Sequence, residues 1–459
     1  MKTSETNSDK RKDAENAERR REDGRRRAGC QGNDCQRNKE NSPDNHSSDN
    51  FGSANLRILF PSSLEIAPSS ADLRFHQLAC IVLLCLTLTG TAGAQLMISG
   101  NENKVDLDTG GIRVIPPTAP DSVSILDFST FPPKVQTIEN IPNTVVGPPS
   151  NIAITPDGSL ALIADSIMVN PTNATKWVPN SAIHVLDLRA TPPRVIGHVQ
   201  AGKQPSGMSI TPDGKFALVA NRAEGTVTLL RIVGKEVSAV ETVKVCLPEE
   251  SPSDVAISPD GKLALATAQK GGFLAVLRLE NGHVEATGQK ISAYGQPYRC
   301  IITPDGALAL TAGQGFGNGI DQDAITVVDL RAKPMRTIQH ITIGAVPESI
   351  ELSPDGKLLV ATVMNGSNLA PDNPSHSTQG ALEILARRGN TFVKIKSLPV
   401  GAIPEGVAFT SDGRYLVVQC HPARELWVFR VKGESVKDTG QRIKVPGMPS
   451  SLRASPSRS

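Results

Sequence analysis

The residues with the clearest potential for chemistry follow a proline that recurs once in every sequence repeat of this chain. The seven prolines are Pro149, Pro205, Pro252, Pro297, Pro347, Pro404 and Pro449. The next residue is serine in four repeats, whereas three consecutive repeats carry Tyr298, Glu348 and Glu405. Arg299 lies one position further on, and the preceding repeat has Asp254 there. These departures from the repeat are the candidate functional positions.

Two carboxylates, a guanidinium and a phenol at neighbouring positions suit the binding of a polar or anionic small molecule. Arginine offers paired hydrogen bonds to a carboxylate or phosphate. A carboxyl group beside another has a raised pKa, which suits general acid–base chemistry. The sequence therefore indicates Glu348 and Glu405 as candidate catalytic residues, and Tyr298, Arg299 and Asp254 as candidate ligand-binding residues. The alternative is a solvated polar channel in which Arg299 only pairs with Glu348.

Two further candidates lie in loops. His421 follows Cys420 in a short loop of the repeat that contains Glu405. It could add acid–base chemistry or a metal ligand, although an isolated loop histidine is otherwise simply solvated. Trp177 lies in the segment SIMVNPTNATKWVPN (166–180), whose polar composition suits hydrogen bonding to a ligand. We expect His421 to be catalytic and Trp177 to bind ligand.

The repeats that carry these residues share a Pro-Asp-Gly turn, or once Ser-Asp-Gly. The aspartates of the turns are Asp157, Asp213, Asp260, Asp305, Asp355 and Asp412. Proline fixes the first turn position and glycine accepts a positive φ, so each turn predicts a tight hairpin. A third strand follows, such as GTVTLLRI (225–232), and then a weaker fourth. Four short strands in a unit of about 50 residues are typical of a β-propeller blade.

A seventh blade is predicted from the two ends of the repeat region. The segment VPGMPSSLRASP (445–456) matches the start of a unit, and LMISGN (96–101) matches a second strand. Closing the ring in this way removes free sheet edges. We therefore predict an all-β, seven-bladed β-propeller over residues 95–459, with four antiparallel strands per blade and a last blade closed by both termini.

This architecture predicts where the candidate residues meet. The first strand of a blade lines the central channel and the Pro-Asp-Gly turns lie at its bottom, so the recurrent prolines lie at the top. The long connections between second and third strands also reach the top, at residues 102–120, 166–180, 313–323 and 364–380. Loops on a rigid scaffold often determine specificity. We expect the functional site at the top mouth of the channel.

The N-terminal region has a different character. Residues 1–73 form a hydrophilic leader, with runs such as RKDAENAERRREDGRRR, which we predict to be disordered or an artefact of the gene model. Residues 74–94, RFHQLACIVLLCLTLTGTAGA, have the pattern of a secretory signal peptide. We therefore expect a periplasmic or extracellular bacterial protein. The alternative is an uncleaved anchor that tethers the propeller to the membrane.

Composition and missing motifs exclude several function classes. The formal net charge is only +2, so nothing in the overall charge points to nucleic acid. The three cysteines after residue 95 (Cys246, Cys300 and Cys420) have no zinc-site spacing and allow at most one disulfide. Motifs for a serine-hydrolase elbow, a phosphate loop and an HExxH site are absent. We predict no metal and no cofactor, and a monomer.

The segment PSGMSITPDGKFALVAN (205–221) resembles the YVTN repeat of bacterial surface-layer and secreted propellers. The resemblance covers residues 95–456 and extends to the wider lactonase-like seven-bladed superfamily, which includes 6-phosphogluconolactonase. It implies the fold directly, whereas its implication for activity is weaker because one fold hosts many functions.

Three functions follow as hypotheses, and whether the chain is an enzyme stays open. The first is an exported binding module whose top loops and channel mouth bind a protein, a glycan or a small polar ligand. The alternative, implied by the resemblance, is a lactonase-type hydrolase acting on a sugar lactone or related anionic molecule. There Glu348 or Glu405 would activate water, while Arg299 with His421 would hold the substrate's anionic group. A third, an electron-transfer or amine-oxidising subunit, lacks a CxxCH haem motif.

Overall fold

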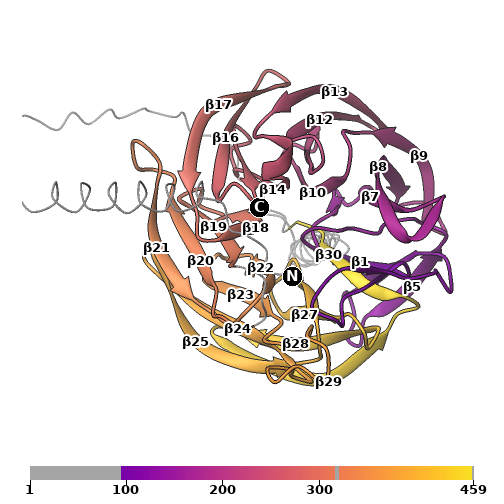
Figure 1. Cartoon of the computed structure of the whole chain (residues 1–459). Coiled ribbons are helices and arrows are strands. Elements are labelled where there is room, and N and C mark those ends of the chain that lie inside the picture. Colours follow the sequence, from indigo (N-terminus) through magenta and orange to yellow (C-terminus); the bar gives the residue numbers. More distant parts are fainter. Residues whose placement is uncertain (1–94, 316–319, 457–459) are drawn as a thin grey trace, which may run out of the picture. The chain divides into compact units, whose positions relative to one another are not determined.

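Seven antiparallel sheets of four strands are arranged as a ring around a central channel (Figure 1). The computed structural model describes residues 95–315 and 320–456. The predicted leader (1–73) and signal peptide (74–94) lie outside the described residues. The predicted seven-bladed, all-β propeller is confirmed, and the one helical segment in the described ranges is the short 3-10 helix η1 (Pro248–Glu250).

Each blade runs from an inner strand at the channel to an outer strand at the rim. Blades 1 and 2 consist of β6 (Ile152–Ile154), β7 (Leu160–Asn170), β8 (Asn173–Asp187), β9 (Arg194–Gln200), β10 (Pro205–Ile210), β11 (Phe216–Asn221), β12 (Thr226–Val233) and β13 (Glu236–Lys244). Blades 3 and 4 consist of β14 (Pro252–Ile257), β15 (Leu263–Ala268), β16 (Phe273–Glu280), β17 (His283–Ser292), β18 (Gln296–Ile302), β19 (Leu308–Gln314), β20 (Ala324–Asp329) and β21 (Arg336–Thr342).

The remaining blades follow the same order, except that the last is assembled from both ends. Blades 5 and 6 consist of β22 (Pro347–Leu352), β23 (Leu358–Val363), β24 (Gly380–Arg388), β25 (Thr391–Val400), β26 (Pro404–Phe409), β27 (Tyr415–Cys420), β28 (Glu425–Lys432) and β29 (Ser435–Lys444). Blade 7 consists of β30 (Met448–Ala454), β1 (Leu96–Glu102), β4 (Ser122–Asp127) and β5 (Lys134–Glu139).

The ring is closed by the pairing of β30 with β1, as the sequence predicts. The two strands are antiparallel, with Met97 opposite Ala454 and Ser99 opposite Leu452. Met97 and Leu452 are fully buried between blades 6 and 7. Apolar contacts of this kind, repeated between neighbouring sheets, form the core and hold the channel rigid.

The aspartate of each Pro-Asp-Gly turn has a structural role. In blade 2 the hydroxyl of Thr211 donates to Asp213 Oδ1 at 2.6 Å, and the backbone N–H of Lys215 donates to the same oxygen at 3.1 Å. Gly214 has φ of 72°, a conformation that glycine adopts without strain. The same hydroxyl–aspartate bond recurs in the other five turns, so these turns shape hairpins.

Two of the expected long top loops contain regular structure. Most of 166–180 continues β7 and β8 as an extended hairpin, because Ile167, Met168 and Val169 keep pairing across it. The connection 102–120 contains a small hairpin of β2 (Val105–Asp106) and β3 (Arg113–Val114).

The cysteines Cys246, Cys300 and Cys420 are buried free thiols. Within the described residues, no helix is long and apolar enough to cross a membrane.

Candidate functional site

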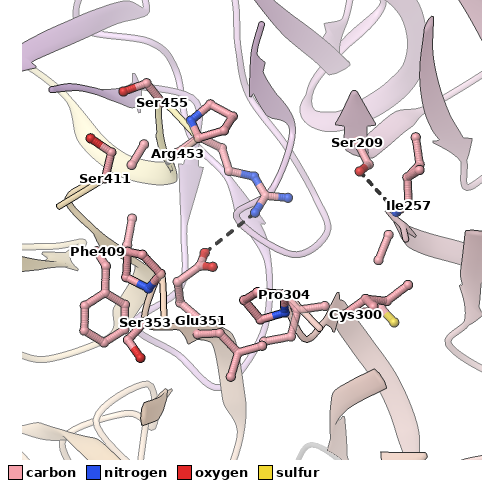
Figure 2. A pocket seen from close by; sticks show the side chains of 18 of the residues that line it. Ser209, Ile257, Cys300, Pro304, Glu351, Ser353, Phe409, Ser411, Arg453 and Ser455 are labelled. Carbon is pink, nitrogen blue, oxygen red and sulfur yellow. Dashed lines mark hydrogen bonds and ion pairs between the residues drawn. The ribbon is translucent and has the colours of Figure 1, made fainter. Parts of the chain in front are cut away.

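The channel has a cavity at each end. The channel-mouth pocket, of about 230 Å³, lies at the top, and the PDG-end cavity, of about 310 Å³, lies at the end with the Pro-Asp-Gly turns (Figure 2). The two cavities share no lining residue. Four of the predicted site residues line the channel-mouth pocket, and these are Tyr298, Glu348, Glu405 and His421.

The pocket is built from two rings of residues that the repeat register defines. The first ring is the residue after the recurrent proline, and it supplies Tyr298, Glu348, Glu405 and Ser450. The second ring is the residue at the end of each second strand, one position past ALVAN and its equivalents. It supplies Glu102, Arg222, Gln269, Gln314, Met364 and His421. Sequence reasoning missed most of this second ring, although aligning the repeats at that position identifies it.

A sharp backbone turn directs the two glutamates into the channel. The residues before their prolines, Val346 and Ile403, have φ of 53° and 47°. This left-handed conformation is strained for β-branched residues, so the surrounding structure must hold it. The N–H of Val346 donates to Asp323 Oδ2 at 2.8 Å, and that of Ile403 donates to Ser367 Oγ at 2.9 Å. These bonds fix where β22 and β26 begin.

Three buried carboxyl groups share the pocket. Glu102, Glu348 and Glu405 are 0%, 7% and 4% exposed. Burial raises the pKa of Glu348 to about 8, against opposing effects of the Gln314 amide, which donates to Oε1 at 2.9 Å, and of Arg222. Burial, with the nearby Glu348 and Glu102, raises the pKa of Glu405 well above its usual value. Such a pair retains at least one proton at neutral pH.

The cation of the pocket is Arg222. Its Nη2 donates to Gln269 Oε1 at 2.6 Å, whereas Nε and Nη1 are buried without a hydrogen-bond partner in the described part of the chain. Burial lowers its pKa, whereas an ionised Glu348 favours its charged form. Burial, and next Glu348, raises the pKa of Tyr298 well above 10, so the phenol stays protonated. A partly unpaired buried guanidinium is suited to an anion or a developing oxyanion.

His421 is 1% exposed, so it is not the solvated loop histidine of the alternative interpretation. Burial lowers its pKa to about 4, which keeps the imidazole neutral at physiological pH. Carbonyl groups of Pro449 and Val105 approach the ring, but neither nitrogen has a hydrogen bond of good geometry among the described residues. Its Nε2 lies 4.0 Å from Glu102 Oε1. A neutral imidazole here can exchange a proton with a carboxyl group or accept a ligand hydroxyl.

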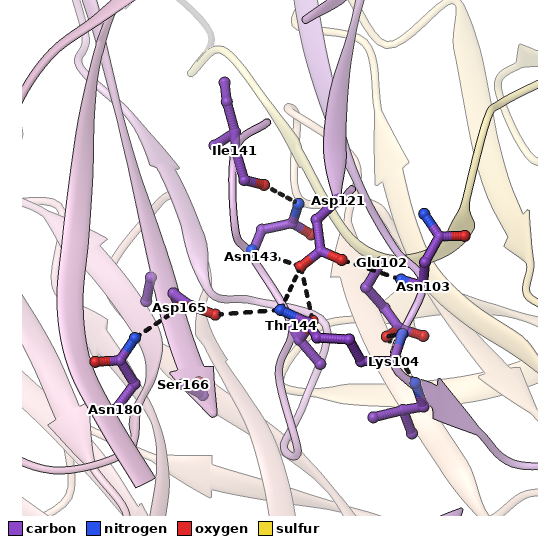
Figure 3. Close-up of polar contacts among 12 residues, drawn as sticks. Glu102, Asn103, Lys104, Asp121, Ile141, Asn143, Thr144, Asp165, Ser166 and Asn180 are labelled. Atoms are coloured by element: carbon purple, nitrogen blue, oxygen red, sulfur yellow. Dashed lines mark hydrogen bonds and ion pairs between the residues drawn. The ribbon is translucent and has the colours of Figure 1, made fainter. Parts of the chain in front are cut away.

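The hairpin of β2 and β3 covers the pocket, and its base is held by a polar network (Figure 3). Lys104 Nζ pairs with Asp121 Oδ2 at 2.7 Å, and Asp121 Oδ1 accepts the N–H of Asn103 at 3.1 Å. Glu102 Oε2 accepts the N–H groups of Lys104 and Val105 at 2.7 and 2.9 Å. At the tip, Gly110 N–H donates to the carbonyl of Asn368 in blade 5 at 2.6 Å. The hairpin is therefore fixed at both ends.

Three predicted ligand-binding residues do not line the pocket, which corrects their expected positions. Arg299 is completely buried deeper in the channel, where it donates to Ser349 Oγ at 2.7 Å and pairs with Glu351 rather than Glu348. Its position follows from alternation along β18, which turns successive side chains to opposite sides. The side chain is too far into the wall to reach a ligand at the mouth.

Asp254 and Trp177 have other surroundings. Asp254 accepts Ser150 Oγ–H at 3.0 Å and the N–H of Cys300 at 2.9 Å, so it joins three blades. A side chain at Gly207 would place a Cβ 1.8 Å from Asp254 Oδ1, so only glycine allows this packing. Trp177 is half-buried on the extension of β8, and the pocket lining does not include it.

Comparisons with known proteins agree with this architecture. Residues 183–303 match the model of the family described as lactonase, 7-bladed β-propeller. The chain is a seven-bladed β-propeller, and its middle part is similar to the lactonase propellers. No curated protein matches this propeller by sequence.

Solved structures share the propeller fold at low sequence identity. The periplasmic gluconolactonase PpgL of Pseudomonas aeruginosa is 19% identical with a TM-score of 0.57, and the match covers 78% of this chain and 98% of that one. A candidate 6-phosphogluconolactonase of Bacteroides uniformis is 20% identical with a TM-score of 0.59, covering 78% and 98%. Hydrazine synthase of Kuenenia stuttgartiensis is 21% identical with a TM-score of 0.50, covering 63% and 78%.

In the ranges 95–315 and 320–456, no group of three or more His, Cys, Asp or Glu side chains is arranged to hold a metal ion. The predicted absence of a metal stays a prediction.

We expect the Glu102→Gln variant to lose part of the pH dependence of stability. Burial raises the pKa of folded Glu102 from 4.5 to about 8, so the folded protein binds this proton more tightly than the unfolded chain. The resulting stability is complete below pH 4.5, falls as the pH rises from 4.5 to about 8, and is absent above it. Glutamine mimics the neutral acid, so the drop in unfolding free energy between acidic and alkaline pH shrinks by at least about 1 kcal/mol.

Urea unfolding on either side of that interval measures this effect. The exposed Glu434, which pairs with Arg388 at the rim, provides the matched control Glu434→Gln. A pH dependence of Glu102→Gln equal to that of the wild type would mean that Glu102 is ionised in the folded protein.

Proposed function

We propose that the channel-mouth pocket hydrolyses a lactone to the corresponding hydroxy acid. The observation that carries this proposal is the buried pair Glu348 and Glu405 beside the partly unpaired guanidinium of Arg222. One ionised and one protonated carboxyl group supply a general base and a general acid, and the guanidinium supplies oxyanion stabilisation. The names of the neighbours PpgL and the Bacteroides protein support the same reaction class.

The proposed hydrolysis uses water and three side chains, those of Glu348, Glu405 and Arg222. The Glu348 carboxylate removes a proton from water as the water oxygen attacks the lactone carbonyl carbon. Arg222 stabilises the negative charge that develops on the carbonyl oxygen. The ring C–O bond then breaks, and the carboxylic acid of Glu405 gives its proton to the departing ring oxygen. Proton exchange between the two glutamates restores the starting state, and the product is a hydroxy acid that ionises in water.

The apolar and polar parts of the pocket have separate roles in this proposal. Val146, Met364 and Ile112 provide an apolar wall against the carbon skeleton. Gln269 orients Arg222, and Gln314 orients Glu348, through the hydrogen bonds described above. His421 lies beside Glu102 and accepts a substrate hydroxyl rather than holding an anionic group, because its imidazole is neutral.

A blocked-pocket variant tests this proposal. Ser450 lines the pocket, and its hydroxyl has no hydrogen-bond partner in the described residues, so Ser450→Leu fills space without breaking a bond. We expect the wild type to hydrolyse glucono-δ-lactone or a related lactone, measured by acid release after subtracting the uncatalysed rate. We expect Ser450→Leu to lose this activity with an unchanged melting temperature. A wild type inactive on a panel of five- and six-membered lactones would overturn the proposal.

Other functional expectations remain proposals. Binding of a protein or glycan by the top loops is one such proposal, whereas the small volume of the channel-mouth pocket favours a small molecule. Export to the periplasm or cell exterior rests on the sequence of 74–94. N-terminal sequencing of the native protein tests it, with a mature end at Gln95 as the expected result.

A further inference from the structure

The PDG-end cavity departs from the repeat as clearly as the channel-mouth pocket does. Its channel-facing ring is the residue four positions after the recurrent proline, which is Ala153, Ser209, Ala256, Ile301, Glu351, Ala408 or Arg453. Five of these are small or apolar, and six of the seven line the cavity. Small residues satisfy the fold at this position, so the charged pair Glu351 and Arg453 calls for a separate explanation.

The guanidinium of Arg453 has hydrogen-bonding capacity that the protein does not use. Its Nε donates to the carbonyl of Ile152 at 3.2 Å, and its Nη2 donates to the carbonyl of Met208 at 3.4 Å. Its Nη1 lies 3.7 Å from Glu351 Oε2, beyond hydrogen-bond distance. A guanidinium has five N–H donors, so several remain for a ligand. The side chain is only 18% exposed, which limits how well water can solvate it.

The acidic groups nearby are shared between two arginines, Arg299 and Arg453. Glu351 Oε2 already accepts Nη2 of Arg299, so one carboxylate faces two guanidinium groups. Asp254, which lies deeper and does not line the cavity, has both oxygens engaged by Ser150 and Cys300. Burial and the neighbouring Arg299 lower the pKa of Arg453 to about 10, against the opposing effects of Asp254 and Glu351.

The cavity gives an anion room and a second donor. Figure 2 shows the Arg453 guanidinium extending into the middle of the cavity, with Glu351 on one side and Ser209 and Ile257 on the other. Ser209 Oγ accepts the N–H of Ile257 at 3.2 Å, so its own hydroxyl proton is free to donate to a ligand. A volume of about 310 Å³ admits a small organic acid or a phosphate ester.

We propose that the PDG-end cavity is a second ligand site, which binds a small oxyanion, a carboxylate or a phosphate group, through Arg453 and Ser209. The site is separate from the proposed reaction site, because the two cavities share no lining residue. Arg453 lies on β30, the strand that closes the ring, whereas Ser209 lies on β10. An anion bound between them holds blades 7 and 2 together, so it stabilises the closed ring by mass action.

Calorimetric titration of the full chain tests this proposal with two probes, sodium phosphate and sodium acetate, at an ionic strength fixed with chloride. We expect one site for at least one probe, with a matching rise in melting temperature. Binding of phosphate alone, of acetate alone or of both supports the site and identifies which oxyanion it prefers. Binding of neither probe overturns it.

Three variants locate the bound anion. We expect Arg453→Gln to weaken binding by about tenfold or more, because it removes a charge-assisted pair of hydrogen bonds. Glu351→Gln removes the competing carboxylate, so we expect tighter binding, and this result stays informative even where Arg453→Gln fails to fold. Arg388→Gln, at the exposed rim pair with Glu434, should leave the affinity unchanged. Unchanged or weaker binding in Glu351→Gln, unchanged binding in Arg453→Gln, or loss of binding in Arg388→Gln would contradict the assignment.

Discussion

Replacing Glu348 with glutamine should lower kcat/KM for lactone hydrolysis by about 10²–10⁴-fold, the usual contribution of a general base. Glutamine has the same shape and can still accept the N–H of Gln314, so the pocket keeps its geometry. It cannot take a proton from water, so the loss falls on kcat rather than on KM. Steady-state kinetics of the purified variant measures the effect, with the uncatalysed rate subtracted at each pH.

Two further variants test whether the loss of rate is specific to the buried glutamates. Glu405→Gln should also lower the rate, since its amide is a far weaker acid toward the departing ring oxygen. Glu434→Gln changes an exposed glutamate at the rim and should retain full activity. If the Glu348→Gln and Glu405→Gln variants both hydrolysed the lactone at the wild-type rate, the carboxyl pair would have no role in the mechanism. The description of the fold would not be affected by that result.

Replacing Arg222 with glutamine should lower kcat by about 10²–10³-fold, the loss typical of a missing oxyanion donor. Two of its guanidinium nitrogens are buried without partners among the described residues, so they are available for the developing charge. Lysine should restore part of the rate, because it keeps the charge but not the planar donor geometry. Arg388→Gln, at the exposed rim pair, is the matched control.

The Arg222 variant also has a readout that a purely structural role would not give. Arg222 favours the ionised form of Glu348, so its removal should move the pKa of Glu348, and with it the pH–rate profile, to higher pH. A lower rate with an unshifted profile would indicate that Arg222 acts through folding or substrate binding alone. The melting temperatures of Arg222→Gln and Arg222→Lys then show whether the lower rate comes from a folding defect or from weaker substrate binding.

The sequence repeat allowed the fold to be predicted. Six units each encode a hairpin through a threonine or serine, an aspartate and a glycine. The seventh blade, closed by β30 and β1, follows from the match of the two terminal segments to the repeat. The register also predicted that Tyr298, Glu348 and Glu405 meet at one channel mouth. These predictions succeed because local turn chemistry and strand alternation determine them.

The rest of the site depends on contacts that the register did not reveal by itself. Arg299 follows Tyr298, yet alternation along β18 buries it against Ser349 and Glu351. Arg222 lies in a short loop with no distinctive sequence motif. Only its position in the second ring, directly after β11, shows that it faces the glutamates. The raised pKa values come from burial under the hairpin of β2 and β3, which the sequence presents only as a long connection.

The pH dependence of kcat/KM tests the central claim most directly, because it reports the ionisation of the free enzyme's base. We predict that the rate rises about tenfold per pH unit and levels off above about pH 8, the pKa to which burial raises Glu348. We predict that this rise disappears in Glu348→Gln. A wild-type profile that is flat from acidic to alkaline pH, or one that Glu348→Gln leaves unchanged, would contradict the account.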